Sequence, residues 1–324
     1  MRHNSLRALA LSFVVIAGSA FGQFTETEGN DSKAAANVFT GLAAGSTITG
    51  NSTSATTVGL DYFRLTMATA APGIYKNRMT LTTSGTAGHV GTLRGLTQTG
   101  GVINAGTDAT LQTSSTVTTP PRYNQWYSFG LGEELFYRMT GAAATTADYV
   151  ATMSTSVVTP VNLGTFAPGA FTFSTLGRTA VDTEIGLYDA NFAPVPGFWA
   201  DDEPSPGTSF QSIMSGTLTP GTYYLAVGSF NMANNNSNPA TDRSQASSVA
   251  DFGGWVMSSS TSITATDWDF GITDINGTTE FSALKTEQYE IYWGELEVVP
   301  EPGTMIALGA GLAGLAARRR RKAA

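Results

Sequence analysis

Short strand-like segments recur along the chain, and apolar and polar residues alternate in two of them, residues 61–67 and 78–82. The others include residues 134–139, 184–188 and 223–227, which are rich in aromatic or β-branched side chains. A period of two places successive side chains on opposite faces of a β-strand. No long stretch of the sequence has the 3.6-residue period of an amphipathic helix. The pattern therefore predicts an all-β protein with one or two antiparallel, jelly-roll-like β-sandwich domains.

Turn-forming residues separate the predicted strands. They are Pro72-Gly73, Pro168-Gly169, Asp189-Ala190-Asn191, Pro220-Gly221 and Asn276-Gly277. Proline presets the first corner of a turn, and glycine adopts the positive φ that many turns need. One short helix is expected over residues 31–39, with Asn30 or Asp31 as its N-cap. We place the boundary between a first domain, 23–157, and a second domain, 158–299.

The first 22 residues have the layout of a secretory signal peptide. Arg2 and Arg7 supply positive charge, residues 8–17 are largely apolar, and small residues follow up to Gly22. This order predicts cleavage after Gly22 or Ala20 and export from the cytoplasm. The sequence has no cysteine, so a lipoprotein anchor is excluded.

The last 25 residues, 300–324, combine three features with different physical demands. Pro300-Glu301-Pro302 interrupts any preceding strand or helix, residues 305–317 are apolar, and residues 318–322 are cationic. As a helix the apolar run would span roughly 20 Å, against about 30 Å for a bilayer core. The cations favour the cytoplasmic side. We expect a short C-terminal hydrophobic helix that enters the membrane transiently or permanently as a sorting segment.

The net charge of the body limits the classes of molecule that it can bind. Removing Arg2, Arg7 and the five terminal cations from the 17 Lys and Arg, and Glu301 from the 25 Asp and Glu, leaves a net charge near −14 for the body, against −8 for the whole chain. A body this acidic repels phosphate backbones, so nucleic acid is excluded as a partner.

Acidic residues in the second half are the best candidates for a metal site. They are Asp182, Glu184, Asp189, Asp201, Asp202 and Glu203. Calcium takes six to eight oxygen ligands, commonly from loops. If these loops meet at one end of a sandwich, we expect Asp182, Asp189, Asp201 and Asp202 to bind calcium. The alternative is a solvated acidic cluster that maintains solubility. No other cofactor is expected.

Few other residues are candidates for ligand binding or catalysis. Trp199, Trp255, Trp268 and Trp293 can stack on sugars if exposed, or form the core if buried. His89 is the single histidine of the body, and no serine lies in a G-x-S-x-G motif. Carboxylate pairs suited to glycoside hydrolysis have no distinguishing flanking motif. We therefore expect a protein that is not an enzyme.

The C-terminal segment resembles the PEP-CTERM sorting signal of exported bacterial proteins. The resemblance rests on Pro300, Glu301 and Pro302, the short apolar run, and the cluster Arg318, Arg319, Arg320 and Arg321. It implies a bacterium that makes extracellular polysaccharide. It also implies an integral-membrane exosortase as partner, which recognises Pro-Glu-Pro and cleaves near it.

The body resembles the bacterial pre-peptidase C-terminal domain, a β-sandwich appended to secreted proteases and surface proteins. The matching elements are residues 26–32, with Gly29 in place of the usual proline, and residues 61–63, 182–189, 201–202 and 218–228. The second half, 182–228, is the better match. The resemblance implies a β-sandwich module.

These features together predict an exported protein of the cell envelope or extracellular matrix, sorted through its C-terminal segment and without enzymatic activity. We expect a role in adhesion or in association with extracellular polysaccharide. Two alternatives stay open at this point: a carbohydrate-binding module and a secreted hydrolase.

Overall fold

The structure is a computed structural model that describes residues 22–51, 59–83, 89–94, 98–99, 102–103, 123–141, 146, 148–204, 206–229, 232–233, 254–258, 260 and 266–300. Strands dominate these residues, which confirms the all-β prediction. Among them, no helix has the length and apolar character needed to cross a membrane. The predicted signal peptide, apart from Gly22, and the segment 301–324 lie outside the described residues.

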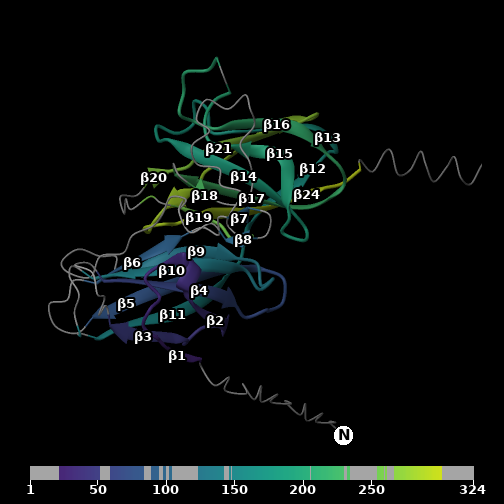
Figure 1. Ribbon diagram of the computed structural model, residues 1–324. Helices are drawn as coiled ribbons and strands as arrows, with labels where there is room; N and C mark the ends of the chain where they lie inside the picture. The colour runs from purple at the N-terminus through teal and green to yellow at the C-terminus, as the bar shows by residue number, and fades with distance from the viewer. Residues whose placement is uncertain are drawn as a thin grey trace, which may run out of the picture.

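The first sandwich packs a five-stranded sheet against a four-stranded sheet (Figure 1). In spatial order, the larger sheet holds β1 (Gln23–Thr25), β3 (Thr47–Asn51), β11 (Asp148–Val158), β5 (Ile74–Thr83) and β9 (Tyr123–Ser128). The smaller sheet holds β2 (Asn37–Leu42), β4 (Leu60–Met67), β10 (Glu134–Thr140) and β6 (Val90–Arg94). Neighbouring strands are antiparallel, except for the parallel pairs β1–β3 and β2–β4.

The second sandwich has the same division into five and four strands. Its larger sheet runs β12 (Val161–Phe166), β24 (Tyr292–Val298), β17 (Gly221–Ser229), β14 (Thr183–Asp189) and β15 (Pro194–Ala200). Its smaller sheet runs β16 (Ile213–Leu218), β13 (Gly169–Ser174), β21 (Phe270–Asp274) and β22 (Gly277–Phe281). Three further two-stranded ribbons join β7 (Gln98–Thr99) with β8 (Val102–Ile103), β18 (Met232–Ala233) with β19 (Met257–Ser258), and β20 (Thr266–Asp267) with β23 (Leu284–Lys285).

Alternation along the strands accounts for the two cores. In β4, Phe63, Leu65 and Met67 point into the first core, whereas Arg64 and Thr66 between them are only half-buried. In β17, Tyr223, Leu225 and Val227 do the same in the second core. All five predicted turn signals lie between strands or at their ends. The period-two pattern therefore sets which face of each sheet is buried.

The prediction of a helix over residues 31–39 is wrong, except that a single helical turn forms within this range. A 3₁₀ turn covers Lys33–Ala35, with Ser32 as its N-cap residue, and β2 begins at Asn37. Residues 37–42 pair in parallel with β4, so backbone hydrogen bonding to a neighbouring strand outweighs the local helix signal. Asn30 is not the cap, and its carbonyl accepts the Tyr62 amide of β4 at 2.9 Å.

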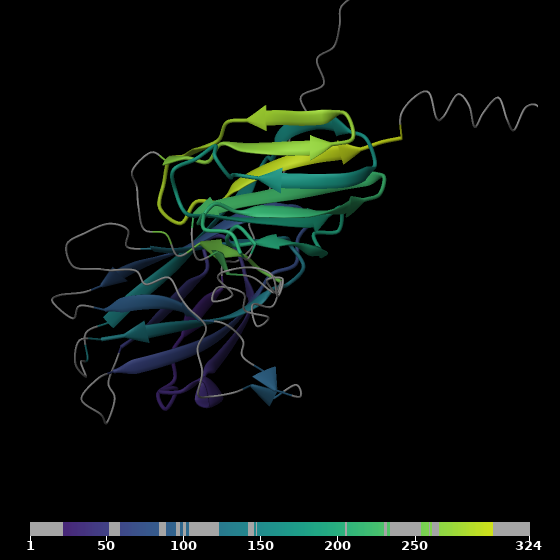
Figure 2. The ribbon, with the colours of Figure 1, turned by 90° about the horizontal axis from the view of Figure 1, so that it is seen from above.

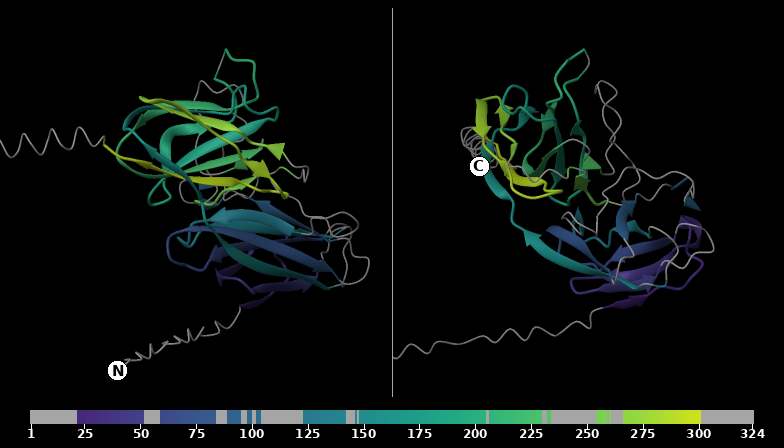
Figure 3. Two further views of the ribbon diagram at one scale, coloured as in Figure 1. Left: turned by 180° about the vertical axis from the view of Figure 1, so that it is seen from behind. Right: turned by 90° about the vertical axis from the view of Figure 1, so that its left-hand side faces the viewer.

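The two sandwiches lie next to each other (Figures 2 and 3), and a separate apolar cluster packs between them. It holds Tyr127 and Phe129 from the first sandwich, and Tyr188, Phe192 and Trp293 from the second. The Phe129 and Phe192 rings stack with centroids 4.9 Å apart. Aromatic rings that are buried in this way remove a large apolar area from water.

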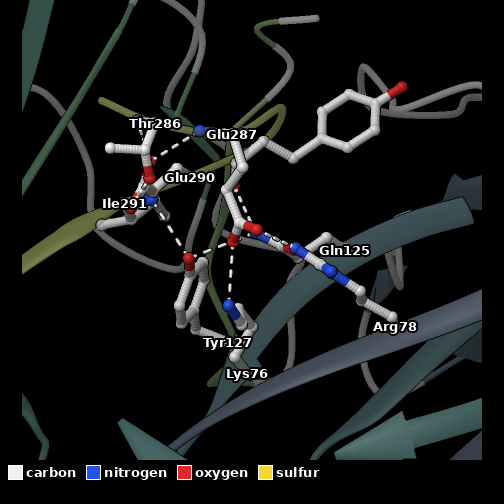
Figure 4. A network of polar contacts seen from close by, with 9 residues as sticks. Lys76, Arg78, Gln125, Tyr127, Thr286, Glu287, Glu290 and Ile291 are labelled. Carbon is white, nitrogen blue, oxygen red and sulfur yellow. Dashed lines mark hydrogen bonds and ion pairs between the residues drawn. The ribbon is translucent and has the colours of Figure 1, made fainter. Parts of the chain in front are cut away.

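Polar contacts surround this cluster (Figure 4). The Glu287 carboxylate accepts a hydrogen bond from Lys76 Nζ at 2.9 Å and also forms an ion pair with Arg78. The Tyr127 hydroxyl accepts the Ile291 amide at 3.1 Å, and Gln125 Nε2 donates to the Tyr289 carbonyl at 2.9 Å. These contacts join β5 and β9 to residues 285–291 of the second sandwich.

The chain also returns to the first sandwich late in the sequence. Val256 and Tyr127 exchange two backbone hydrogen bonds, at 2.7 and 2.9 Å. Trp255 and Met257 belong to the first core and are completely buried. The first core therefore includes side chains from beyond the predicted boundary at residue 158. The division into two domains stays a prediction.

Candidate functional sites

A cluster of three carboxylates lies at the edge of the first sandwich. Glu26, Glu28 and Asp61 each offer one oxygen within 4.8 Å of the others, and they are the one such group of acidic, His or Cys side chains among the described residues. Glu28 is exposed, Glu26 is half-buried, and Asp61 is 1% exposed. The first two follow β1, and Asp61 is in β4.

Backbone pairing brings these residues together. The Glu26 amide donates to the Thr49 carbonyl at 2.9 Å, which extends the β1–β3 pairing. Further along, the Asn30 carbonyl accepts the Tyr62 amide at 2.9 Å, so the segment after β1 crosses over β4. Asn37 Oδ1 accepts the Thr27 amide between these two points, at 2.7 Å. The segment 26–30 is thus held beside Asp61 by main-chain contacts.

Burial and mutual repulsion disfavour the ionised form of the carboxylates in this cluster. Burial, followed by the nearby charge of Glu26, raises the pKa of Asp61 from 3.8 to about 9. Burial also raises the pKa of Glu26, although Glu26 accepts the Asn51 amide at 2.8 Å. The Tyr149 hydroxyl donates to the same carboxylate at 3.1 Å. At neutral pH and without a counter-charge, Asp61 therefore keeps its proton.

Several oxygens at this site have unused bonding capacity. Asn30 Oδ1, Asp61 Oδ2 and Glu26 Oε1 are buried and make no hydrogen bond of normal geometry with the described residues. A cavity of about 290 Å³ opens beside Glu26 and is also lined by Glu28 and Tyr149, whereas Asp61 and Asn30 are not among its lining residues. Three carboxylates and an amide oxygen are hard ligands of the kind that calcium prefers. A divalent cation would supply the missing positive charge and displace the Asp61 proton.

Sequence reasoning missed this site. The sequence predicts a strand over residues 61–67 and a helix cap at Asn30 or Asp31, and residues 26–32 also resemble a family element, but none of these patterns points to a metal site. The spacing Glu26-x-Glu28-x-Asn30 was the available signal, because alternate residues of an extended segment share one face. What the sequence does not show is that Asp61, more than thirty residues later, lies beneath that face.

The four residues expected to bind calcium are not brought together. Asp182 precedes β14 and Asp201 and Asp202 follow β15, at the same end of this antiparallel pair. Asp189 is at the other end of β14, where its Oδ1 accepts the amides of Asn191 and Ala193 at 2.8 and 2.9 Å. Asp201 and Asp202 are buried. Calcium binding by Asp182 and this pair stays a prediction, and Asp189 instead caps a turn.

The remaining candidates are buried. Glu184 accepts the Trp199 indole N–H at 3.0 Å and also the Met232 amide. None of Trp199, Trp255, Trp268 and Trp293 is more than 2% exposed, so their rings form cores and present no face to a sugar. His89 is buried against Tyr149, and burial lowers the pKa of His89.

The second candidate site begins where β24 ends. Val298 is buried, the Val299 amide donates to the Phe166 carbonyl at 2.9 Å, and Pro300 is the last described residue. Residues 298–321 match the family model of the PEP-CTERM protein-sorting motif. The chain carries a PEP-CTERM sorting motif. It includes Glu301, Pro302 and the four arginines 318–321, all of which lie outside the described residues.

The motif determines the coarse cellular role. PEP-CTERM signals are processed by exosortase, so the chain is an exported protein that is directed to the cell envelope. No curated protein matches the chain significantly. The resemblance of the body to the pre-peptidase C-terminal domain stays a prediction.

Proposed function

We propose that this PEP-CTERM protein is a non-enzymatic component of the bacterial envelope or extracellular matrix that associates with extracellular polysaccharide or acts in adhesion. The observation that carries the proposal is the position of the sorting motif, which follows directly on a central strand of a packed two-sandwich body. Sorting then delivers the whole β body to the outside. The C-terminal segment inserts into the membrane during this process, and the N-terminal segment acts as the signal peptide.

We further propose that the body works with calcium bound at Glu26, Glu28 and Asp61. An acidic body is repelled by anionic polysaccharides, and bound divalent cations reduce that repulsion. The raised pKa of Asp61 and the position of three carboxylate oxygens within 4.8 Å of one another support cation binding at this cluster. Calcium at Asp182, Asp201 and Asp202 is the second position to test.

Co-sedimentation tests the association. The purified protein is mixed with polysaccharide from the producing bacterium, with calcium or with a chelator. We expect binding in calcium, and loss of binding with the chelator and in the D61N variant. The exposed E280Q variant, far from the cluster, is the matched control and should bind like the native protein. Failure to sediment with any polysaccharide fraction in calcium would contradict the proposal.

The two alternatives predict different results. A carbohydrate-binding module would recognise one defined glycan on an array, through residues other than the four buried tryptophans. A secreted hydrolase would turn over glycans or peptides in an activity screen. Turnover that disappears with a single carboxylate substitution would favour the hydrolase over our proposal.

A further inference from the structure

The sorting motif begins almost inside the folded body. Val298 pairs on one side with Gly221 of β17 and on the other with Phe166 of β12. Its side chain is 1% exposed, and the Val299 amide is still hydrogen-bonded to the Phe166 carbonyl. Two residues, Val299 and Pro300, therefore separate a strand that is bonded on both edges from Glu301.

This short connection limits where a processing enzyme can bind. A residue of extended chain spans at most about 3.6 Å, so the Glu301 Cα lies within about 11 Å of the Val298 Cα. An enzyme domain is several times wider than this distance. An enzyme that holds Pro300-Glu301-Pro302 must therefore also meet the end of the sandwich from which the motif leaves.

That surface, here called the β24 end, consists of residues 167–168, 190–193, 219–220, 275–276 and Val299. The strand registers place these loops together. Gly169 pairs with Leu218, Asp189 pairs with Tyr223, and Asp274 pairs with Gly277. The Ala167 amide donates to Asp274 Oδ2 at 2.8 Å, which joins two of the loops.

The β24 end is apolar and poor in charge. Ile275 is 78% exposed at the tip of the β21–β22 hairpin, and Val299 is 38% exposed. Three acids flank it: Asp189 and Asp274 accept backbone amides of their own turns, and Glu297 accepts the Thr222 hydroxyl at 2.7 Å. The opposite end of the same sandwich holds Arg178, Asp182, Asp201, Asp202 and Glu203.

This contrast matters because the body carries a net charge near −14. Where a membrane or protein surface is anionic, bringing like charges together costs free energy. The body approaches such a surface with least repulsion through an end that has few charges. An exposed isoleucine also suits contact with an apolar partner surface.

We infer that the β24 end of the second sandwich is the surface with which this protein docks on exosortase while its motif is being processed. The inference rests on the proposed function, since it takes exosortase as the enzyme that acts on this motif. It adds a second recognition element, in the folded body, to the linear motif.

Site-specific photo-crosslinking in the producing bacterium tests the docking. One photoreactive residue replaces Ile275, and a second replaces Phe210 in a separate variant. Phe210 is the matched control, because it is 59% exposed and its carbonyl accepts the Thr183 amide at the opposite end of the sandwich. A third probe at Gly303 reports engagement of the motif itself. We expect crosslinks to exosortase from positions 275 and 303 and not from 210.

The outcomes separate the inference from the proposed function. Crosslinks from 303 without any from 275, or equal crosslinks from 275 and 210, would overturn the docking surface and leave processing intact. Crosslinks from 275 to lipid alone would overturn exosortase as its occupant. Absence of a crosslink to exosortase from 303 would reject exosortase processing, and the docking surface with it.

An introduced charge and an inserted spacer test docking at the β24 end independently of crosslinking. I275E should slow removal of the tail about tenfold, which corresponds to about 1.4 kcal/mol of lost binding, and F210E should not. A flexible spacer of about 20 residues between Val299 and Pro300 lets the motif reach the enzyme alone, so it should restore the rate of I275E. Both substitutions are at exposed positions, and an unchanged melting temperature checks the fold. Equal processing of I275E and F210E would contradict the inference.

Discussion

The indole N–H of Trp255 donates to the backbone carbonyl of Glu134 at 2.9 Å, which fixes a residue of the second half of the chain in the core of the first sandwich. Trp255 is fully buried there. We predict that W255A lowers the free energy of unfolding by about 3–5 kcal/mol, because it leaves a cavity and an unpaired carbonyl. Thermal or denaturant unfolding measures this loss.

The location of the increased hydrogen exchange tests the shared core more specifically than the total loss of stability does. W255A should increase hydrogen exchange in β4 and β10 of the first sandwich. W268A is the matched control, since Trp268 is equally buried in the second core and donates to Ser229 Oγ at 3.1 Å. It should increase exchange in β21 and β13 instead. Loosening of the second sandwich alone by W255A would contradict the shared core.

Glu287 makes a second, polar connection between the sandwiches. Burial alone would raise the pKa of Glu287, but hydrogen bonds from Lys76 and Arg78 outweigh it and hold the pKa below its ordinary value of 4.5. A lowered folded-state pKa stabilises the protein above the unfolded-state pKa, and this stability is lost as the pH falls through the folded-state value. We predict that E287Q costs about 1 kcal/mol at pH 7 and that the difference from the native protein shrinks below pH 4. Unfolding at several pH values measures it, and a cost that grows on acidification would contradict the assignment.

Asp61 gives the opposite pH dependence. Its folded-state pKa is about 9 and its ordinary value is 3.8, so the folded protein binds more protons than the unfolded chain between these values. Stability without calcium should therefore fall as the pH rises from about 4 to about 9. D61N removes this dependence and should stabilise the calcium-free protein at pH 8.

Bound calcium should remove the loss of stability that ionisation of Asp61 causes. We predict that calcium raises the melting temperature by several degrees at pH 8 and by less at pH 5, where protons compete for the same oxygens. D61N should abolish this response. D202N should retain it, because Asp202 is in the other sandwich. A response lost in D202N and kept in D61N would move the calcium site to the second sandwich.

The sequence predicts the parts of this structure that depend on neighbouring residues. Alternation along 61–67 predicts β4, aromatic and β-branched residues after Pro220-Gly221 predict β17, and Asn276-Gly277 marks a hairpin end. The sorting motif is also readable, because all its parts are consecutive. The helix over 31–39 fails because its second half pairs with a strand that starts at Leu60.

The candidate site depends on contacts between distant residues, which a single sequence does not show. Glu26 and Asp61 meet because a segment after β1 crosses β4, and Trp255 enters a core built by strands more than a hundred residues earlier. The loops that hold Asp189 and Asp201 are close in sequence, but β15 runs between them, so the two residues are at opposite ends of the sandwich. All three relationships depend on how strands and segments distant in sequence pair and pack.

Intact-mass spectrometry of the protein isolated from the envelope and the medium of the producing bacterium tests the central claim most directly. We predict a mature form that lacks both the first 22 residues or so and the terminal arginines 318–321. The E301Q variant should keep its tail, whereas E280Q should be processed normally. A native protein that stays inside the cell with its arginine cluster intact would contradict the account.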